Sequence, residues 1–449
     1  MQKLWQKNWK LNEVLEAFET QGDLALDQKL VKFDVLGSIA HTQGLQRIGL
    51  LTATEAQTLT QGLQDINSLS QNGQFLLQFG DEDVHTKIEN YLTNSLGDVG
   101  KKIHTGRSRN DQVLTAIRLF TKENLLLVWQ ETLELIGVFQ KFASDNSCLL
   151  MPGYTHMQKA MPSTIGLWAG AFADSLSDDL VMLKASYQLN NQSPLGSAAG
   201  YGVPLSLDRQ YVSDTLGFDK VQLNSLYCQN SRGKIESSVI ASLISILQSI
   251  NRFATDVLIF TMSEFDFIKV GPELCSGSSI MPQKKNVDIA ELLRSKVHLL
   301  LGNYTQTVSL SSNLASGYNR DLQDSKKPLF ESLELTIQCL QIAKLLVSSI
   351  SVNTEKIRAA VTPELFATHY ALSLVEKGLP FRAAYQKAAA EFQKVETNQL
   401  YNVATSQLGS VEKICLENLA VRLKQESATY QIENKKYQLI IKNILSTKG

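Results

Sequence analysis

One long stretch of this sequence has neither proline nor the alternation of a strand. No proline occurs between Pro204 and Pro272, and apolar side chains prevail in residues 236–266. The polar side chains there recur at steps of four and three, the period of one helix face; they are Ser238, Ser242, Ser245, Ser249, Arg252 and Asp256. So narrow a polar stripe predicts a very long helix that other helices cover on most sides.

Four more segments have a comparable helical pattern: residues 113–143, 163–189, 287–314 and 328–350, the last beginning at Pro328. Only 9 of the 449 residues are proline, and strand alternation is hard to find. We therefore expect a mostly α protein with a central bundle of long helices. Because a bundle this apolar rarely closes within one chain, helices of other subunits are expected to complete it; cover by the terminal domains is the alternative.

The sequence predicts three domains. Residues 1–106 form an N-terminal helical domain, and residues 107–356 form the long-helix domain. Shorter helices, interrupted at Thr362–Pro363 and at residues 378–380, predict a small C-terminal helical domain over residues 357–449.

Charge and composition exclude several functions. The chain has 43 Lys and Arg against 44 Asp and Glu, so no broad nucleic-acid or membrane surface is expected. Its longest strictly apolar run, residues 125–129, is far below the roughly 20 residues that span a bilayer, and the N-terminus lacks a secretory apolar region. Five scattered cysteines and six dispersed histidines predict a cytoplasmic protein without a metal centre.

The first of four polar segments, residues 104–112, directly precedes a predicted helix. It carries two guanidinium groups, on Arg107 and Arg109, with Ser108 and Asn110 beside them. Such donors at a helix N-terminus bind carboxylate or phosphate. A solvated loop with a helix cap is the alternative, but nine polar or glycine residues in succession favour anion binding.

Two further polar segments also contain groups capable of catalysis. In residues 152–158, His156 lies beside a turn, where a structural histidine is more common than an acid or base. Residues 277–286 form a pliant loop in which Lys284 and Asn286 offer a cation and an amide to developing negative charge. A surface Ser-Gly turn is the alternative for this loop.

The fourth polar segment, residues 318–326, supplies donors suited to a zwitterionic ligand; a charged interhelical turn is its alternative. The sequence has no dinucleotide fingerprint and no serine-hydrolase elbow at these positions. Removal of a proton next to a carboxylate needs a positioned base, cations around the carboxylate and an acid for the leaving group. The four segments fit that chemistry best.

The loop GSSIMPQKKN (residues 277–286) resembles the shared loop of the fumarase/aspartase superfamily of elimination lyases. HTGRSRNDQV, PGYTHMQKAMP and YNRDLQDSKK resemble the argininosuccinate lyases within it, and the likeness extends from about Asp34 to about Pro380. It implies a three-domain α fold and a homotetramer whose active sites are shared between subunits. It also implies reversible cleavage of argininosuccinate to arginine and fumarate without a cofactor, the last step of arginine synthesis.

The resemblance also implies residue roles. Ser278 would be the general base at the succinyl carbon, and His156, oriented by Glu291, the acid toward the guanidinium group; the reverse assignment of Ser278 and His156 stays open. Lys284 and Asn286 would hold the carboxylate that takes up the electron pair. The positions implied for the fumarate half are Ser108, Arg109, Asn110 and Thr155, and those for the arginine half are Tyr318, Gln323 and Lys326.

Three more positions follow from the same likeness. His85, in DEDVHT, matches a family segment near the site, and Arg232 matches a family arginine. Asp23 aligns where the family commonly has serine, and its carboxylate would contact the ammonium or guanidinium group of the arginine half. Val287 stands where proline is frequent, and the last seventy residues, which match weakly, carry no assigned role.

Other functions are compatible with this reading. A related lyase would release fumarate from adenylosuccinate, malate or aspartate. The same scaffold also serves as a non-catalytic crystallin, and a carboxylate-binding module would bind without turnover. The presence of Ser278, His156, Lys284 and Glu291 favours an active enzyme.

Overall fold

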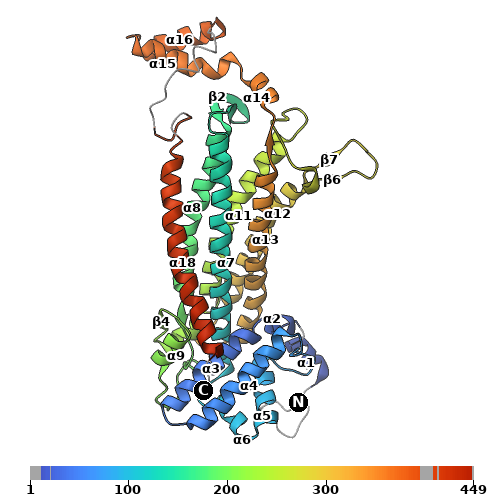
Figure 1. Ribbon diagram of the computed structural model, residues 1–449, viewed down its shortest axis with the longest axis vertical. Coiled ribbons are helices and arrows are strands. Elements are labelled where there is room, and N and C mark those ends of the chain that lie inside the picture. Colours follow the sequence, from blue (N-terminus) through green and yellow to red (C-terminus); the bar gives the residue numbers. More distant parts are fainter. Residues whose placement is uncertain (1–11, 21, 395–407, 412–413, 447–449) are drawn as a thin grey trace.

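The computed structural model describes residues 12–20, 22–394, 408–411 and 414–446, and these are mainly helical. Long helices lying side by side form the centre of the molecule (Figure 1). They are α7 (Arg109–Asp145), α8 (Ile165–Asn190), α11 (Lys234–Phe260), α12 (Asp288–Ser311) and α13 (Lys326–Ser349). The predicted mostly α fold with a central bundle of long helices is confirmed.

Side-chain caps set several of these helix ends. The Ser108 side chain caps α7 in a capping box with Asp111, and Thr164 caps α8 by accepting from the Leu167 amide. The long apolar helix predicted over residues 236–266 is α11, and in the structure it ends at Phe260 rather than at Asp266. The chain then turns, and Asp266 adopts a left-handed conformation with φ of 47°.

Shorter elements surround the lower end of the bundle as Figure 1 shows it, where most of the N-terminal segment packs. They are α1 (Glu13–Thr20), α2 (Leu24–Gln28), α3 (Val31–Arg47), α4 (Ala53–Gln71), α5 (Val84–Leu96), α6 (Asp98–Lys101), η1 (Lys102–His104), β3 (Gln192–Ser193), α9 (Arg209–Thr215), β4 (Lys220–Val221), α10 (Ser225–Asn230) and η3 (Arg320–Ser325).

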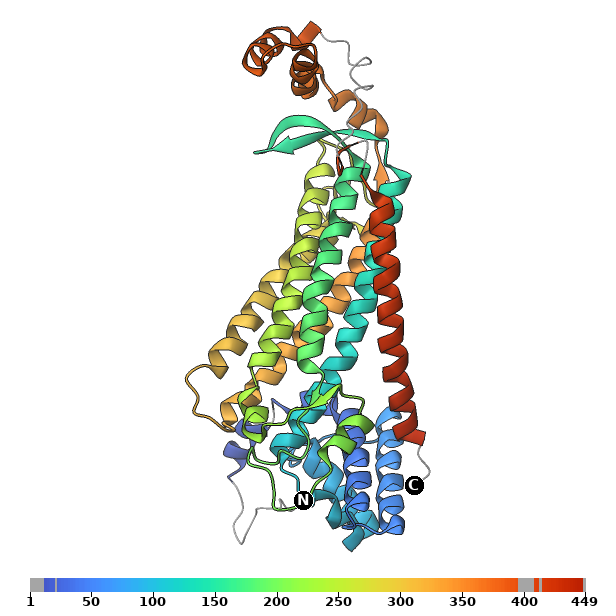
Figure 2. The ribbon, with the colours of Figure 1, turned by 90° about the vertical axis from the view of Figure 1, so that its left-hand side faces the viewer.

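The upper end and side of the bundle carry most of the remaining elements (Figure 1). They are β1 (Leu150–Thr155), β2 (Gln158–Thr164), β5 (Ile268–Lys269), η2 (Pro272–Leu274), β6 (Ser276–Gly277), β7 (Lys285–Asn286), β8 (Ser351–Val352), α14 (Thr354–Ala360), η4 (Pro363–Phe366), α15 (Ala367–Glu376), α16 (Phe381–Glu391) and η5 (Phe392–Lys394). Figure 2 shows the β1–β2 hairpin extending at the upper end. Strands β5 and β8 pair antiparallel, as do β6 and β7, whereas β3 and β4 pair in parallel.

The longest strands form a hairpin that the sequence did not predict. Strands β1 and β2 pair antiparallel, with Thr155 opposite Gln158. His156 and Met157 form the two-residue turn and have positive φ values of 52° and 61°. Positive φ at both central positions is the mark of a type I′ turn, which is usually built from Asn and Gly. Because these two side chains give no such signal, the hairpin escaped the sequence reading.

Part of the polar stripe of α11 is covered within the chain. Ser245 and Ser249 both donate to the carboxylate of Asp179 on α8, the second at 2.7 Å. The Trp168 indole of α8 donates to Asp256 at 2.9 Å. Intrachain packing by α8, rather than another subunit or a terminal domain, therefore covers these positions of the stripe.

Helix α11 is long and apolar enough, by length and composition, to cross a membrane. Its most apolar 18 residues have a mean hydropathy of 1.3, and half of that stretch is buried inside the chain. It lies against α8, α12 and α13. A core helix of a bundle meets the same criterion, so one such helix is weak support for a membrane span.

The last helix, α18 (Leu416–Ser446), lies along the bundle rather than beside α14–α16 (Figure 1). Its Tyr437 is buried and donates to Glu123 of α7 at 2.9 Å. Nearer its start, Glu426 pairs with Lys184 of α8 at 2.6 Å. This helix, placed by sequence in a separate C-terminal domain, thus reinforces the central bundle.

Asp111→Asn is expected to lower the free energy of unfolding by about 2 to 4 kcal/mol. The buried Asp111 carboxylate accepts from the amides of Ser108, Gly196 and Ala198 at 2.9 to 3.0 Å. An asparagine amide would set its own N–H groups against one of those donors. Urea unfolding measures the change, and exposed Asp98→Asn is the control. Equal stability of the two variants would contradict this account.

Candidate functional site

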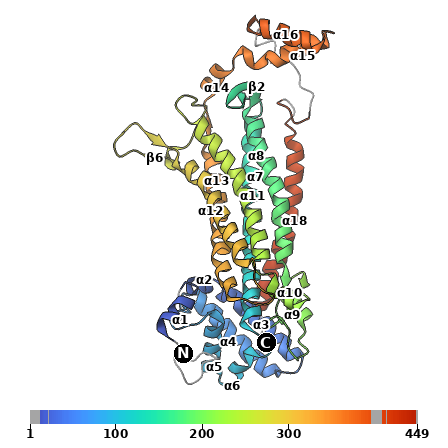
Figure 3. The same ribbon diagram turned by 180° about the vertical axis from the view of Figure 1, so that it is seen from behind.

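The predicted site residues form three separate groups in the chain (Figure 1, Figure 3). One group lies in a cleft where the N-terminal helices meet the lower end of the bundle. Thr155 and His156 lie at the β1–β2 hairpin at the upper end. The third group belongs to the β6–β7 loop, which extends from the side of the bundle.

The cleft has a volume of about 190 Å³. It contains eight of the residues predicted from the sequence: Asp23, His85, Arg109, Asn110, Arg232, Tyr318, Gln323 and Lys326. The other residues that line it are Glu19, Asp27, Glu82, Asp83, Val113 and Arg320. Ser108 is at its edge, where its hydroxyl accepts from the Asn110 amide at 3.3 Å.

Lys326 is a buried cation between two carboxylates. Its ammonium group donates to Asp27 at 2.6 Å and to Asp23. Burial lowers the pKa of Lys326, but Asp27 and Asp23 outweigh burial and raise it. Burial, with help from Asp27, raises the pKa of Asp23 to about 6 against the opposing effect of Lys326. Asp23, predicted to contact substrate, contacts Lys326 in this structure.

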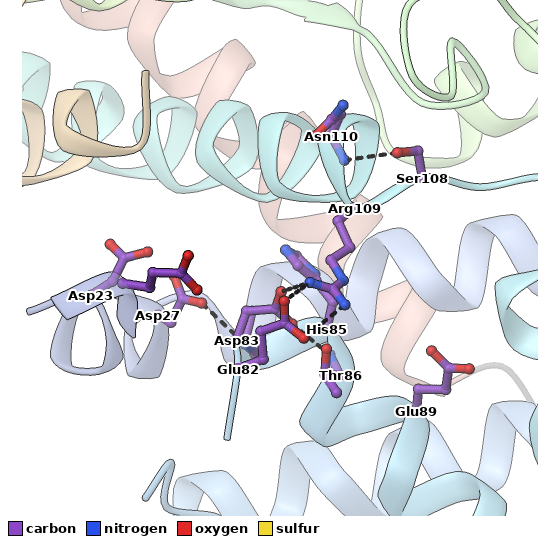
Figure 4. Close-up of polar contacts among 12 residues, drawn as sticks. Asp23, Asp27, Glu82, Asp83, His85, Thr86, Glu89, Ser108, Arg109 and Asn110 are labelled. Carbon is purple, nitrogen blue, oxygen red and sulfur yellow. Dashed lines mark hydrogen bonds and ion pairs between the residues drawn. The ribbon is translucent and has the colours of Figure 1, made fainter. Parts of the chain in front are cut away.

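Arg109 is held by two acidic residues from the segment before α5 (Figure 4). Its guanidinium makes a two-point contact with Glu82, with one distance of 2.8 Å, and lies 3.4 Å from Asp83. Such a forked pair fixes the plane of the guanidinium. In this structure the Glu82 carboxylate therefore occupies the donor pair of Arg109.

Another side of the cleft is formed by η3, by Tyr318 just before it, and by Arg232 and Glu19. The Arg232 guanidinium lies 5.0 Å from the centre of the Tyr318 ring. Gln323 donates to the Glu19 carbonyl at 2.8 Å, and Arg320 pairs with the Glu19 carboxylate at 3.1 Å. Groups of both signs therefore line the cleft, which suits a ligand that carries carboxylates together with cationic nitrogen groups.

His156 and Thr155 are exposed at the hairpin tip. Glu291, predicted to orient His156, is exposed near the start of α12. Within the part of the chain that the structure describes, the side chains of His156 and Glu291 make no hydrogen bond or ion pair. The pairing of His156 with Glu291 is thus not formed inside one chain.

The loop between β6 and β7 holds Ser278 and Lys284, and Asn286 lies in β7. The Ser278 hydroxyl accepts from the Met281 amide at 3.0 Å and from the Ile280 amide at 3.4 Å. Lys284 is exposed. Two backbone amides thus donate to the Ser278 oxygen, and such donors stabilise the negative charge of an alkoxide.

Sequence reasoning missed six residues that line the cleft: Glu19, Asp27, Glu82, Asp83, Val113 and Arg320. Glu82 lies in the acidic run beside His85, and Arg320 lies in the fourth polar segment, so both had a local signal. Glu19 and Asp27 come from short N-terminal helices that only tertiary packing brings to the cleft. In the described ranges no group of three His, Cys, Asp or Glu side chains is arranged to hold a metal ion.

Comparison with known proteins defines the class to which this fold and cleft belong. A family model described as lyase matches residues 10–302. A variant of EDDS lyase with bound fumarate superposes with a TM-score of 0.81 at 20% identity, covering 98% of this chain and 97% of the other. The class II fumarase of Schistosoma mansoni has a TM-score of 0.72 at 15% identity, covering 94% and 92%. The fold is that of these lyases.

Two curated relatives identify the family more closely. The argininosuccinate lyase of Thermotoga neapolitana is 44% identical over 391 residues, which cover 87% of this chain and 98% of the relative. That of Phocaeicola vulgatus is 41% identical over 94% of this chain and 95% of its own length. The chain belongs to the argininosuccinate lyase family, which confirms the resemblance found in its motifs.

Proposed function

We propose that this protein cleaves argininosuccinate reversibly to L-arginine and fumarate, the last step of arginine biosynthesis. The supporting observation is the cleft in which Arg109 and Lys326 offer cations and Asp23, Asp27 and Glu82 offer carboxylates. Argininosuccinate carries carboxylates, an ammonium group and a guanidinium group, so it matches both signs. Family membership at 44% identity adds support for this substrate over malate or adenylosuccinate.

The complete active site requires more than one subunit. His156 at the β1–β2 turn, Ser278 in the β6–β7 loop and the cleft around Arg109 belong to different parts of one chain, so chemistry that uses all three needs neighbouring chains to bring them together. Figure 3 shows β2 and β6 far from the N-terminal helices. Helix α12 presents exposed apolar side chains, Leu292 at 58% and Leu299 at 54% exposure, along a long helix face. Burial of such a face favours the homotetramer implied by the motifs.

In that assembled site the reaction is an acid–base elimination without a cofactor. Ser278 removes the proton from the succinyl carbon, and the electron pair enters the neighbouring carboxylate, which Lys284 and Asn286 hold. The pair then returns to form the double bond of fumarate as the carbon–nitrogen bond breaks. His156, oriented by Glu291, gives its proton to the leaving guanidinium nitrogen, so protons and charge balance.

The other side chains position substrate. Ser108, Arg109, Asn110 and Thr155 hold the fumarate half. Asp23 acts through Lys326, its contact in the structure. The arginine half lies against Tyr318, Gln323 and Lys326, and Arg232 lines the same cleft beside Tyr318. The chain is divided into three domains, residues 1–106, 107–356 and 357–449, and α18 of the third domain packs along the long-helix bundle of the second. The protein is located in the cytoplasm.

Wild-type protein mixed with argininosuccinate is expected to release fumarate, which is followed by its ultraviolet absorbance. Adenylosuccinate, malate and aspartate, tested in parallel, are expected to give no comparable rate. Turnover of one of these and not of argininosuccinate would overturn the substrate assignment. Binding of argininosuccinate without turnover of any substrate would overturn the enzymatic function.

A further inference from the structure

His85 has one ring nitrogen paired and the other unpaired, although its side chain is buried. The residue is 5% exposed and lines the cleft. Its Nδ1 is hydrogen-bonded to the Asp34 carboxylate of α3. Its Nε2 has no hydrogen-bond partner among the described residues and is shielded from solvent. An unpaired buried polar atom next to a ligand cleft is a site for a ligand atom.

Asp34 is itself held firmly behind His85. It is 4% exposed, and its second oxygen accepts from the Ser38 hydroxyl at 3.2 Å. The Ser38 oxygen in turn accepts from Arg107 at 2.9 Å. Burial opposes ionisation of Asp34, but His85 and Arg107 outweigh it and lower the pKa of this carboxyl. The carboxylate is therefore a fixed negative charge on the far side of the His85 ring.

We propose that Asp34 is a positioning residue that holds His85 as an imidazolium, whose Nε2–H donates to a carboxylate of the substrate in the cleft. The inference rests on the proposed function, because it assigns a role at the same site. Asp34 touches no substrate and acts only through the His85 ring. It fixes both the ring orientation and the charge, as a carboxylate does for a histidine whose other nitrogen serves a ligand.

The surroundings of His85 favour its charged form. The charged or titratable groups that face it are Asp27 of α2, Asp34 of α3, Asp83 before α5, His104 of η1 and Arg109 of α7. Burial lowers the pKa of His85, but Asp34, Asp83 and Asp27 outweigh burial and raise it above the ordinary value of 6.5. Burial, with Arg107 and Arg109, lowers the pKa of His104 to about 4, so that ring stays neutral at pH 7.

The test is competitive inhibition by fumarate, measured on the full-length protein at pH 6 and pH 8. His85→Gln is expected to raise the inhibition constant about tenfold or more at both pH values, because a charge-assisted hydrogen bond is lost. Asp34→Asn is expected to raise it about tenfold at pH 8, because the buried ring loses the carboxylate that most raises its pKa, and by a smaller factor at pH 6. The double variant is expected to lose no more than His85→Gln alone.

Two measurements keep the test decisive if Asp34→Asn does not fold. Wild-type affinity for fumarate is expected to stay constant as pH rises through 6.5 and to fall only above it. Ser38→Ala leaves the His85–Asp34 bond in place and is expected to change affinity less than about threefold. A fall in affinity centred at 6.5, or additive losses in the double variant, would overturn the inference.

The outcomes also separate this inference from the proposed function. Cleavage of argininosuccinate that is indifferent to His85 overturns the inference alone. Fumarate binding that depends on His85 and Asp34, in a protein that leaves argininosuccinate intact, overturns the proposed reaction and supports the inference.

Discussion

The Ser278→Ala protein is expected to release fumarate from argininosuccinate about 1000-fold more slowly than wild type, with little change in KM. A positioned general base contributes roughly 10²- to 10⁴-fold to such a step. The hydroxyl of Ser278 is also the group that receives two backbone donors in its loop. Initial rates measured by ultraviolet absorbance give the effect.

Ser279→Ala is the matched control because it removes a neighbouring, exposed hydroxyl of the same loop. It is expected to retain turnover within about fivefold, as for a surface change without a buried partner. If Ser278→Ala kept turnover within tenfold while His156→Ala abolished it, His156 would be the group that takes the proton. That result would reverse the two roles assigned here.

Mixing two inactive variants is expected to restore activity. Ser278→Ala disables the loop, and Asn110→Ala disables the cleft, where Asn110 lies at the start of α7. If each site combines a cleft from one subunit with a loop from another, random assembly leaves about a quarter of sites without either substitution. Coexpression of the two variants, followed by the fumarate assay, measures the recovery.

A second mixture provides the control for the shared site. Asn110→Ala and Gln323→Ala both alter the same cleft of the same chain. Their mixture is expected to stay inactive, because no cleft escapes substitution. No recovery in either mixture would show that the loop and the cleft do not come from different subunits. Equal recovery in both would show that Asn110 and Gln323 do not serve one site from the same chain.

The helical fold could be predicted because its signal is local. The period of polar residues such as Ser245 and Ser249 marks α11, and the Ser108 segment marks the start of α7. The β1–β2 hairpin could not be predicted, since His156 and Met157 are unusual residues for its turn. The position of α18 depends on contacts such as Tyr437 with Glu123, more than 300 residues apart.

The cleft could be predicted where dense polar segments supply it, and less well elsewhere. Arg109 and Lys326 stand in such segments, and both line the cleft. Asp34 and Asp27 sit among helix-forming residues, where an acidic side chain is usually a solvated surface group. Their roles appear only when packing buries them against His85 and Lys326.

The most direct test of the shared active site is a structure of the assembled Ser278→Ala protein with argininosuccinate bound. We expect substrate in the cleft lined by Arg109 and Lys326, with position 278 of one neighbouring subunit and His156 of another on opposite sides of the bond that breaks. Substrate bound in the cleft with position 278 and His156 distant from it in every subunit would contradict the proposed mechanism.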